Sequence, residues 1–347
     1  MRVGLVGFSQ SGKSTLFQAL TDVKPDPAAA MKGQVGIAKV HDDRLDFLCG
    51  MFNPKKTAPA TVEFVDTPGL IRGEKGDNPQ RLATLRNADG LLVVLDAFSG
   101  SAESPAEQFR IFRDELFFAD LEVVLNRIQK LEQGAKKNRT AEVREKEEKE
   151  LSDLKRIAEK LEAGQSFEGM EFSDEFLRTI RSYQLFCLKP ILCTINRSED
   201  NLKAEVEPEL LKNVPNTVST SAKLELDLTQ LDDADRAMFM EEMGVTELAR
   251  DRVIRAAYDA VGLISFFTVG EDECKAWTIK RNTNAVEAAG KIHSDIARGF
   301  IRAELVAYKD LHELGAMKEV RAKGLQRLEG KEYVVADGDI INFRFSV

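Results

Sequence analysis

The sequence is poor in metal-binding side chains and has no long hydrophobic run. Its four cysteines form no Cys-x-x-Cys pair and its three histidines lie away from them. This pattern argues against a zinc site and predicts free thiols in a reducing compartment. No apolar run approaches the roughly 18 residues that a membrane span requires, and the chain opens on a strand-like segment rather than a signal peptide. We therefore expect a cytoplasmic protein without membrane association.

The chain also lacks an excess of positive charge. Its formal net charge is −9, which argues against coating nucleic acid by bulk charge and leaves room for a local basic face. With 347 residues and 43% hydrophobic side chains, it has ample material for a large core and for more than one domain. No internal repeat or low-complexity tract interrupts it.

Short apolar segments dominate the first hundred residues. They predict strands over 2–7, 35–40, 62–67 and 90–97, with a helix over 14–20. Near-continuous apolar strands between helices are typical of a mostly parallel sheet covered on both faces. The strand pattern resumes at 190–196 and 217–222, so these segments are expected to extend the same α/β fold.

Residues 119–163 are rich in Glu, Lys, Leu and Arg. They carry two apolar stripes at helical spacing: Leu121, Val124, Leu125, Ile128 and Leu131, then Leu151, Leu154, Ala158 and Leu161. A polar segment containing Gly134 lies between them, which predicts two antiparallel helices in a coiled-coil hairpin. Because each stripe covers only about two heptads, a plain helical insertion is the alternative.

A last block begins near Leu263. Two strand-like segments precede a helix expected over 285–300, for which Asn284 with Glu287 is a plausible N-cap, and further strands follow. This order predicts a small α+β domain of ubiquitin-like type.

The segment from Gly7 to Thr15 matches the phosphate-loop pattern G-x-x-x-x-G-K-[ST] between a predicted strand and a predicted helix. Glycines let backbone N–H groups converge on a phosphate, a lysine reaches the β- and γ-oxygens, and a serine supplies a hydroxyl to Mg²⁺. The candidate nucleotide-binding residues of this loop are Ser9, Gln10, Ser11, Gly12, Lys13, Ser14 and Thr15.

A second phosphate-sensing segment runs from Asp66 to Gly69 and follows a predicted strand. Asp66 is placed to steady a Mg²⁺-bound water, and Gly69 lets its amide approach a γ-phosphate. Leu70 occupies the position where many GTPases carry the glutamine that orients the attacking water. We therefore expect slow intrinsic hydrolysis and name no certain catalytic residue.

The candidate base loop follows the strand at 190–196. It reads Asn196, Arg197, Ser198, Glu199 where a guanine-binding loop reads Asn-Lys-x-Asp. A longer acid and an exchanged lysine weaken the case for guanine without establishing adenine. Downstream, Ser221, Ala222 and Lys223 match the S-A-K loop that backs the base in such sites.

With these residues in place, the sequence resembles the YchF family, the ATP-preferring branch of Obg-related P-loop NTPases. Members carry N-x-x-E in the base loop, which here is Asn196 to Glu199, and a hydrophobic residue at the position of Leu70. The likeness extends over nearly the whole chain, including "PATVEFVDTPGL", "DRVIRAAYDAVGLISFFTVG" and "DGDIINFRF".

The resemblance implies a Ras-like, Obg-type nucleotide-binding domain over 1–118 and 186–262, a helical coiled-coil insertion over 119–185, and a C-terminal β-grasp TGS domain over 263–347. It also implies ATP as ligand with Mg²⁺ held by Ser14 and Asp66, and association with a ribosome, a ribosomal subunit or a translation factor. Contact with rRNA would use the helical and TGS domains. Basic residues for such a face are Lys275, Lys280, Arg281, Lys291, Arg298 and Arg302.

This chain departs from the family pattern in three places. Gln10 replaces an asparagine that supports a monovalent cation, which puts potassium stimulation in doubt. Ala30 falls where a switch threonine would coordinate Mg²⁺, and an alanine has no ligand atom. The segment beginning at Asp66 reads D-T-P-G rather than D-I-A-G.

Three functions stay open at this point. The first is a slow ATPase switch that docks on ribosomes, and the second is a GTPase of Obg type that tolerates Glu199. The third is a scaffold that binds ATP without hydrolysing it, which the residues Ala30 and Leu70 make credible.

Overall fold

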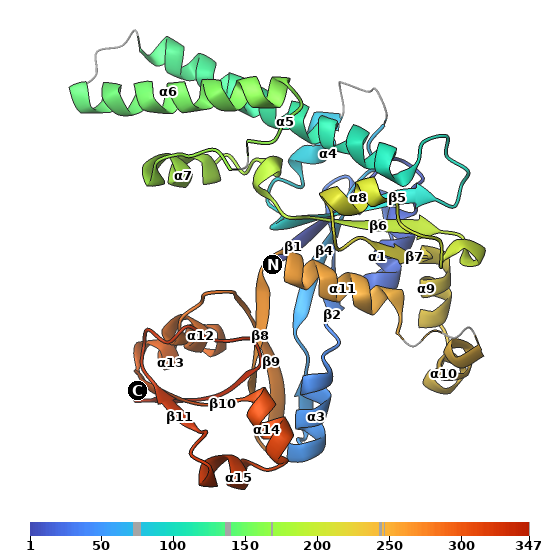
Figure 1. The fold of residues 1–347 in the computed structure, drawn as a ribbon, viewed down its shortest axis with the longest axis vertical. Coiled ribbons are helices and arrows are strands. Elements are labelled where there is room, and N and C mark those ends of the chain that lie inside the picture. Colours follow the sequence, from blue (N-terminus) through green and yellow to red (C-terminus); the bar gives the residue numbers. More distant parts are fainter. Residues whose placement is uncertain (72–77, 136–139, 168, 243–244, 246, 347) are drawn as a thin grey trace. The chain divides into compact units, whose positions relative to one another are not determined.

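The computed structural model describes residues 1–71, 78–135, 140–167, 169–242, 245 and 247–346. The chain divides into two compact units, one made of residues 1–36 and 64–250 and the other of residues 37–63 and 251–347. Figure 1 colours both by sequence position.

The first unit is built on a sheet whose described strands run in the order β2-β4-β1-β5-β6-β7. These are β2 (Gln34–Lys39), β4 (Thr61–Asp66), β1 (Arg2–Val6), β5 (Gly90–Ala97), β6 (Ile191–Arg197) and β7 (Val218–Thr220). The pairs β1/β5, β5/β6 and β6/β7 are parallel. The strands predicted from the apolar segments are confirmed, with ends that differ by at most two residues.

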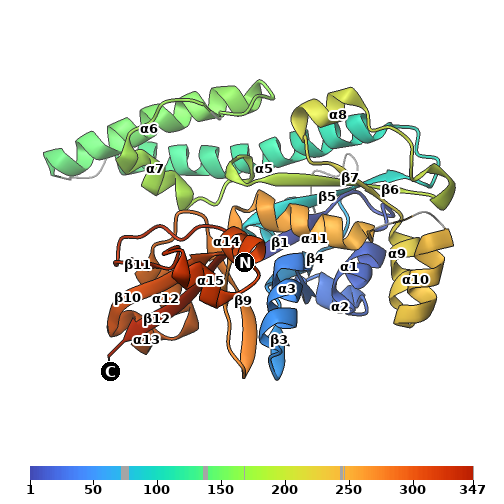
Figure 2. The ribbon, with the colours of Figure 1, turned by 60° about the horizontal axis from the view of Figure 1, so that its bottom comes forward.

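Helices cover both faces of this sheet, as predicted. Helices α1 (Lys13–Thr21) and α9 (Ala222–Thr229) lie on one face, and α5 (Pro105–Gly134) and α8 (Pro208–Asn213) on the other (Figures 1 and 2). Side chains of β5 such as Val93 pack with Phe112 and Leu116 of α5 in the core. The unit also contains α2 (Pro27–Ala30), α4 (Asn78–Ala83), α10 (Asp233–Glu242), and the short 3₁₀ helices η1 (Phe186–Leu188) and η2 (Glu199–Asn201).

The helical insertion forms a hairpin. Helix α5 continues beyond the sheet and packs along α6 (Ala141–Glu162), and α7 (Asp174–Arg181) follows. A separate core cluster joins them, and it contains most of both predicted stripes. Leu125 is an exception, because its side chain is 43% exposed. The first helix begins at Pro105 rather than near residue 119, so one continuous helix serves both the sheet and the hairpin.

The second unit contains another sheet, with described strands in the order β11-β10-β12-β8-β9-β3. These are β11 (Arg327–Glu329), β10 (Phe300–Ala307), β12 (Asp339–Phe345), β8 (Leu263–Thr268), β9 (Glu273–Lys280) and β3 (Lys56–Ala58). Its helices are α3 (Asp43–Phe52), α12 (Ala285–Ile292), α13 (Ser294–Arg298), α14 (Tyr308–Leu314) and α15 (Met317–Ala322); α11 (Ala249–Ala260) spans the division between the units.

The helix predicted over 285–300 is broken into α12 and α13. Asn284 caps α12 as predicted, because its side chain accepts from the Glu287 N–H at 2.9 Å. His293 ends α12 in an extended conformation and caps α13 by accepting from the Asp295 N–H.

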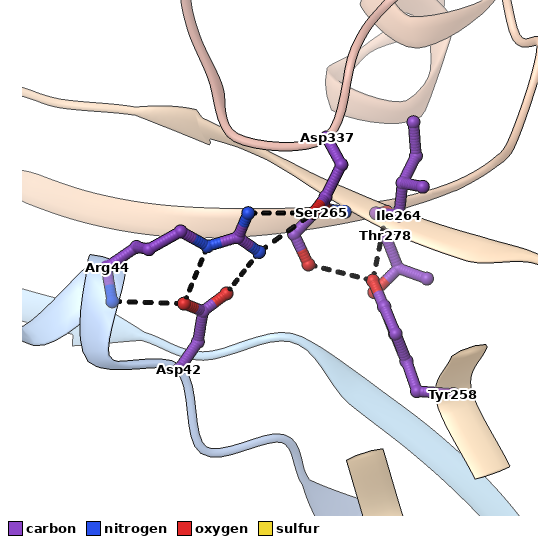
Figure 3. A network of polar contacts seen from close by, with 7 residues as sticks. All are labelled: Asp42, Arg44, Tyr258, Ile264, Ser265, Thr278 and Asp337. Carbon is purple, nitrogen blue, oxygen red and sulfur yellow. Dashed lines mark hydrogen bonds and ion pairs between the residues drawn. The ribbon is translucent and has the colours of Figure 1, made fainter. Parts of the chain in front are cut away.

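A polar network attaches residues 37–63 to the rest of the second unit (Figure 3). Arg44 donates to both oxygens of Asp42 and to both oxygens of Asp337. Asp337 also accepts from the Ser265 N–H at 2.9 Å, which links the loop before β12 to β8. The Tyr258 hydroxyl contacts Ser265 from the other side. The fold therefore uses one arginine to join α3, β8 and the loop before β12.

The sequence did not assign residues 37–63 to the second unit or β3 to the second sheet, and the compact units differ there from the predicted domain boundaries. The three-domain division and the β-grasp assignment of residues 263–347 stay predictions. Among the described residues, no helix combines the length and the hydropathy needed to cross a membrane.

Candidate functional site

The phosphate loop connects β1 to α1 and has a backbone that only certain residues tolerate. Gly12 has φ 87°, a conformation in which a side chain is strained. A Cβ placed on Gly12 would also lie 2.1 Å from Nδ2 of Asn196. Gln10 adopts φ 67° as a non-glycine residue, and its side chain is exposed together with that of Ser9. The loop therefore needs glycine where Asn196 approaches it.

Lys13 begins α1, and its side chain folds back across the loop. Its Nζ donates to the Phe8 carbonyl oxygen at 2.9 Å, and the residue is 5% exposed. Burial lowers the pKa of Lys13 to about 8, although the nearby charge of Asp66 acts in the opposite direction. A phosphate bound in the loop would favour the charged amine and raise this pKa.

Ser14 and Asp66 are in contact. The Ser14 hydroxyl donates to Oδ2 of Asp66 at 3.0 Å, and Asp66 is 1% exposed with no described partner for Oδ1. Burial raises the pKa of Asp66, and the bond from Ser14 opposes that shift. A buried carboxylate oxygen beside a hydroxyl is an oxygen donor set of the kind that Mg²⁺ prefers. The pair therefore fits the ion that the sequence predicts.

The segment after Asp66 lies against the phosphate loop. A Cβ on Gly69 would lie 2.7 Å from the Ser9 nitrogen, so glycine permits this close approach. Leu70 exchanges backbone hydrogen bonds with the loop, since its N–H donates to Gly7 and its carbonyl accepts from Ser9, both at 3.0 Å. The Leu70 side chain is 2% exposed and belongs to the core. This apolar side chain therefore packs into the core and offers no polar atom to water.

Ala30 is the last residue of α2 and is 8% exposed. Its methyl group is buried, and the residue brings no ligand atom to this part of the site. The remaining loop residues are Ser11, which is buried with no described partner for its hydroxyl, and the half-buried Thr15.

Asn196 connects three parts of the site. Its Nδ2 donates to the Ser11 carbonyl oxygen at 3.0 Å, and its Oδ1 accepts from the Ala222 N–H at 2.9 Å. Ser221 caps α9 through its hydroxyl, which accepts from the Leu224 N–H. The sequence predicts Asn196 beside the base, and its described side-chain bonds join the phosphate loop to the start of α9.

The other base-loop residues are more exposed. Glu199 opens η2 with an exposed side chain, and the Lys223 side chain is also exposed. Arg197 points away along the loop, since it donates to the Ser219 hydroxyl and to the Glu205 carbonyl oxygen. This direction differs from that of a lysine whose stem packs over a base.

Three residues near the candidate site carry no motif by which the sequence alone would reveal them: Phe98, Gln108 and Asn78. Phe98 is 45% exposed, and its ring lies 3.7 Å from a Cβ built on Gly12. Gln108 donates to the Asp96 carbonyl and accepts from the Asp96 N–H. The Asn78 side chain accepts a hydrogen bond from the Ile71 N–H and donates one to the Ile71 carbonyl oxygen. The sequence signal that could have indicated Phe98 is its position directly after the predicted strand 90–97.

Two family models match separate parts of the chain. Residues 2–127 match a family model described as "50S ribosome-binding GTPase", and residues 263–346 match the C-terminal model of YchF GTPases, described as a protein of unknown function.

Two full-length relatives are the "Ribosome-binding ATPase YchF" proteins of Bacillus subtilis and Escherichia coli O157:H7. They are 37% and 34% identical, covering 100% of this chain and 100% and 99% of their own lengths. The solved structure of Schizosaccharomyces pombe YchF GTPase aligns with a TM-score of 0.85 at 27% identity over 99% of this chain and 97% of that one. The chain belongs to the YchF family.

Proposed function

We propose that the protein is a P-loop nucleoside triphosphatase that binds and slowly hydrolyses ATP and associates with the ribosome. The observation that carries the nucleotide site is the cluster formed by the buried residues Lys13 and Asp66 and the exposed Ser14, whose hydroxyl donates to Asp66. Lys13 is desolvated and Asp66 Oδ1 has no described partner, a state that a phosphate and a Mg²⁺ ion together would relieve. Lys13 would bind the phosphates, whereas Ser14 and Asp66 would hold the ion.

Backbone N–H groups of the phosphate loop would donate further hydrogen bonds to the phosphates. Residues Ser9 to Ser14 surround the start of α1, where N–H groups and the helix dipole attract anions. Thr15 follows in the first turn of this helix. The Gly69 amide lies beside Ser9 and would contact the γ-phosphate.

The base would lie between the Asn196 loop, the Ser221–Lys223 loop and Phe98. Asn196 fixes the spacing of the two loops, Glu199 would face the base edge, and Phe98 would stack on its ring. Adenine is favoured by the relatives, which are named ATPases. A GTPase is the second candidate, because the fission-yeast neighbour is named a YchF GTPase.

Hydrolysis is expected to be slow because Leu70 is a core residue and cannot orient water. With Ala30 buried as well, a partner that completes the site would set the turnover rate. The relatives are named ribosome-binding, which supports the ribosome as that partner. We place the contact on the helical insertion, residues 119–185, and on the proposed TGS domain, residues 263–347, where Lys280, Arg281, Lys291, Arg298 and Arg302 are exposed.

The decisive experiment is a paired titration of the protein with Mg-ATP and Mg-GTP, followed by turnover with and without ribosomes. ATP is expected to bind more tightly, and ribosomes are expected to raise the rate. A GTP preference of about tenfold or more, equivalent to about 1.4 kcal/mol, would replace the ATPase assignment with the GTPase one. If ATP binds but is not hydrolysed under all of these conditions, the protein is instead a scaffold that uses ATP as a structural ligand.

A substitution tests the site itself. Lys13→Ala is expected to abolish nucleotide binding, because it removes the only side chain in the loop that carries positive charge. Lys130→Ala, at an exposed position on α5, is the matched control and should bind nucleotide normally. Unchanged ATP affinity in the Lys13 variant would overturn the assignment.

A further inference from the structure

Two cysteines of the second unit lie next to each other although they are far apart in the sequence. Cys49 is in α3, which packs against β9, and Cys274 is in β9. Cys49 Sγ lies 3.2 Å from the Thr57 hydroxyl, and Thr57 is the aligned partner of Cys274 in the parallel pair β3/β9. Aligned residues on neighbouring strands project to the same face of a sheet. Cys49 therefore packs on the strand pair where Thr57 and Cys274 lie side by side, which brings the two thiols together within one unit.

The two thiols differ in their access to solvent. Cys274 is buried, whereas Cys49 is half-buried and both are free. Because a solvent-borne oxidant reaches the more accessible sulfur first, Cys49 is the side chain that would react with it. Cys274 would then act as the resolving thiol from inside the unit.

We propose that Cys49 and Cys274 form an oxidation-sensitive dithiol site that a peroxide converts into a disulfide. In the first step the Cys49 thiolate attacks hydrogen peroxide, giving a sulfenic acid and releasing hydroxide, which is protonated to water. In the second step the Cys274 sulfur attacks the Cys49 sulfur, loses its proton and displaces a second water. Two thiols and one peroxide thus give one disulfide and two waters, and a dithiol reductant reverses the change.

The position of the pair gives the link a structural consequence. Helix α3 lies in the connection between β2 and β3 and carries Cys49, so the disulfide would fasten this connection to β9. A covalent link between residues so far apart in sequence restricts the unfolded chain strongly. The oxidised protein is therefore expected to melt several degrees higher than the reduced protein.

The test uses the full-length protein treated with hydrogen peroxide, alkylated without reduction, and mapped by peptide mass spectrometry. A linked peptide pair containing residues 49 and 274 is expected, with two of the four thiols lost and then recovered with dithiothreitol. Cys49→Ser and Cys274→Ser should each abolish this link. Cys187→Ser is the matched control, because Cys187 is also half-buried but belongs to the first unit, and it should leave the link intact.

Three outcomes overturn the proposal. One is loss of thiols without the 49–274 peptide, and another is a linked peptide that contains Cys187 or Cys193 instead. The third is retention of all four thiols at peroxide levels that oxidise a small-molecule thiol. Since the wild-type protein reports the link directly, the result does not depend on whether the Cys274 variant folds.

Discussion

Asn196 donates a hydrogen bond from Nδ2 to the carbonyl oxygen of Ser11 at 3.0 Å. Asn196 lies near the end of β6 and Ser11 lies in the phosphate loop, so the bond fixes the distance between that loop and the start of the base loop. The other end of the same side chain holds Ala222. One buried amide therefore determines the geometry of the site, and the first prediction concerns its removal.

Asn196→Ala is expected to lower the free energy of unfolding by about 1–3 kcal/mol and to weaken ATP binding, because two buried backbone groups lose their partner. Urea denaturation and ATP titration measure the two effects. Asn201→Ala is the control, since the Asn201 side chain is exposed and bonds only locally to Ser198. Equal behaviour of the two variants would contradict the role assigned to Asn196.

The stability of the nucleotide-free protein should depend on pH through Lys13. Its pKa in the folded state is about 8, below the ordinary value of 10.5. Between these values the unfolded chain binds a proton that the folded chain does not, so the free energy of unfolding rises as pH increases from 8 to about 10. Below pH 8 both states are protonated and this contribution is constant. Lys13→Met should lack the rise when the two proteins are compared by urea denaturation, and parallel pH profiles would refute the assignment.

Leu70→Gln is expected not to restore fast hydrolysis. The glutamine would occupy a core position and bury an amide without a designed partner, at a cost of about 1–3 kcal/mol. Turnover should stay slow while the midpoint of urea denaturation falls. Ile71→Gln is the neighbouring control, because Ile71 is 41% exposed and should tolerate the change. A large gain in turnover by the Leu70 variant would show that the side chain can reach the nucleotide.

Phe98→Ala should weaken ATP binding by roughly 5- to 150-fold if the ring stacks on the base, since such stacking contributes about 1–3 kcal/mol. Titration with Mg-ATP gives the affinity directly. Phe118→Ala removes an aromatic ring from α5 that is 66% exposed, and it should bind ATP normally. If inorganic triphosphate binding falls as much as ATP binding, the effect of Phe98 is on the loop rather than on the base.

Arg44→Lys is expected to destabilise the second unit by about 1–3 kcal/mol. A lysine cannot reproduce the fork that contacts Asp42 and Asp337 (Figure 3), and both carboxylates would lose partners. Thermal unfolding of the full chain measures the change. Arg298→Lys, at a side chain that is 80% exposed, is the control and should unfold like the wild-type protein.

Much of the site could be predicted from local sequence. The phosphate loop has a fixed spacing, because the turn, the lysine and the helix start must follow one another directly, and Gly7 to Thr15 satisfy that spacing. Asp66 could be identified as a candidate metal ligand because it ends an apolar strand about fifty residues after the phosphate loop. The hairpin stripes gave the buried faces of α5 and α6, apart from Leu125.

Other features depend on contacts between distant segments. The sequence places Leu70 in the position of the usual glutamine, but only packing against the core shows where the side chain points. Asn196 is predicted beside the base, and the structure adds that its bonds to Ser11 and Ala222 connect the phosphate loop to the start of α9. No local pattern could indicate these bonds, because their partners come from separate parts of the chain.

The sequence by itself therefore determined the chemistry that we propose for this protein: a phosphate loop, Ser14 and Asp66 as candidate metal ligands, and a candidate base loop with Glu199 in place of the usual aspartate. Those features depend on residue type and short spacing. Tertiary structure alone decided that β3 joins the second sheet through β9, and that Cys49 contacts Thr57 beside Cys274 at that junction. Strand pairing and the juxtaposition of side chains arise from long-range packing, which local periodicity does not encode.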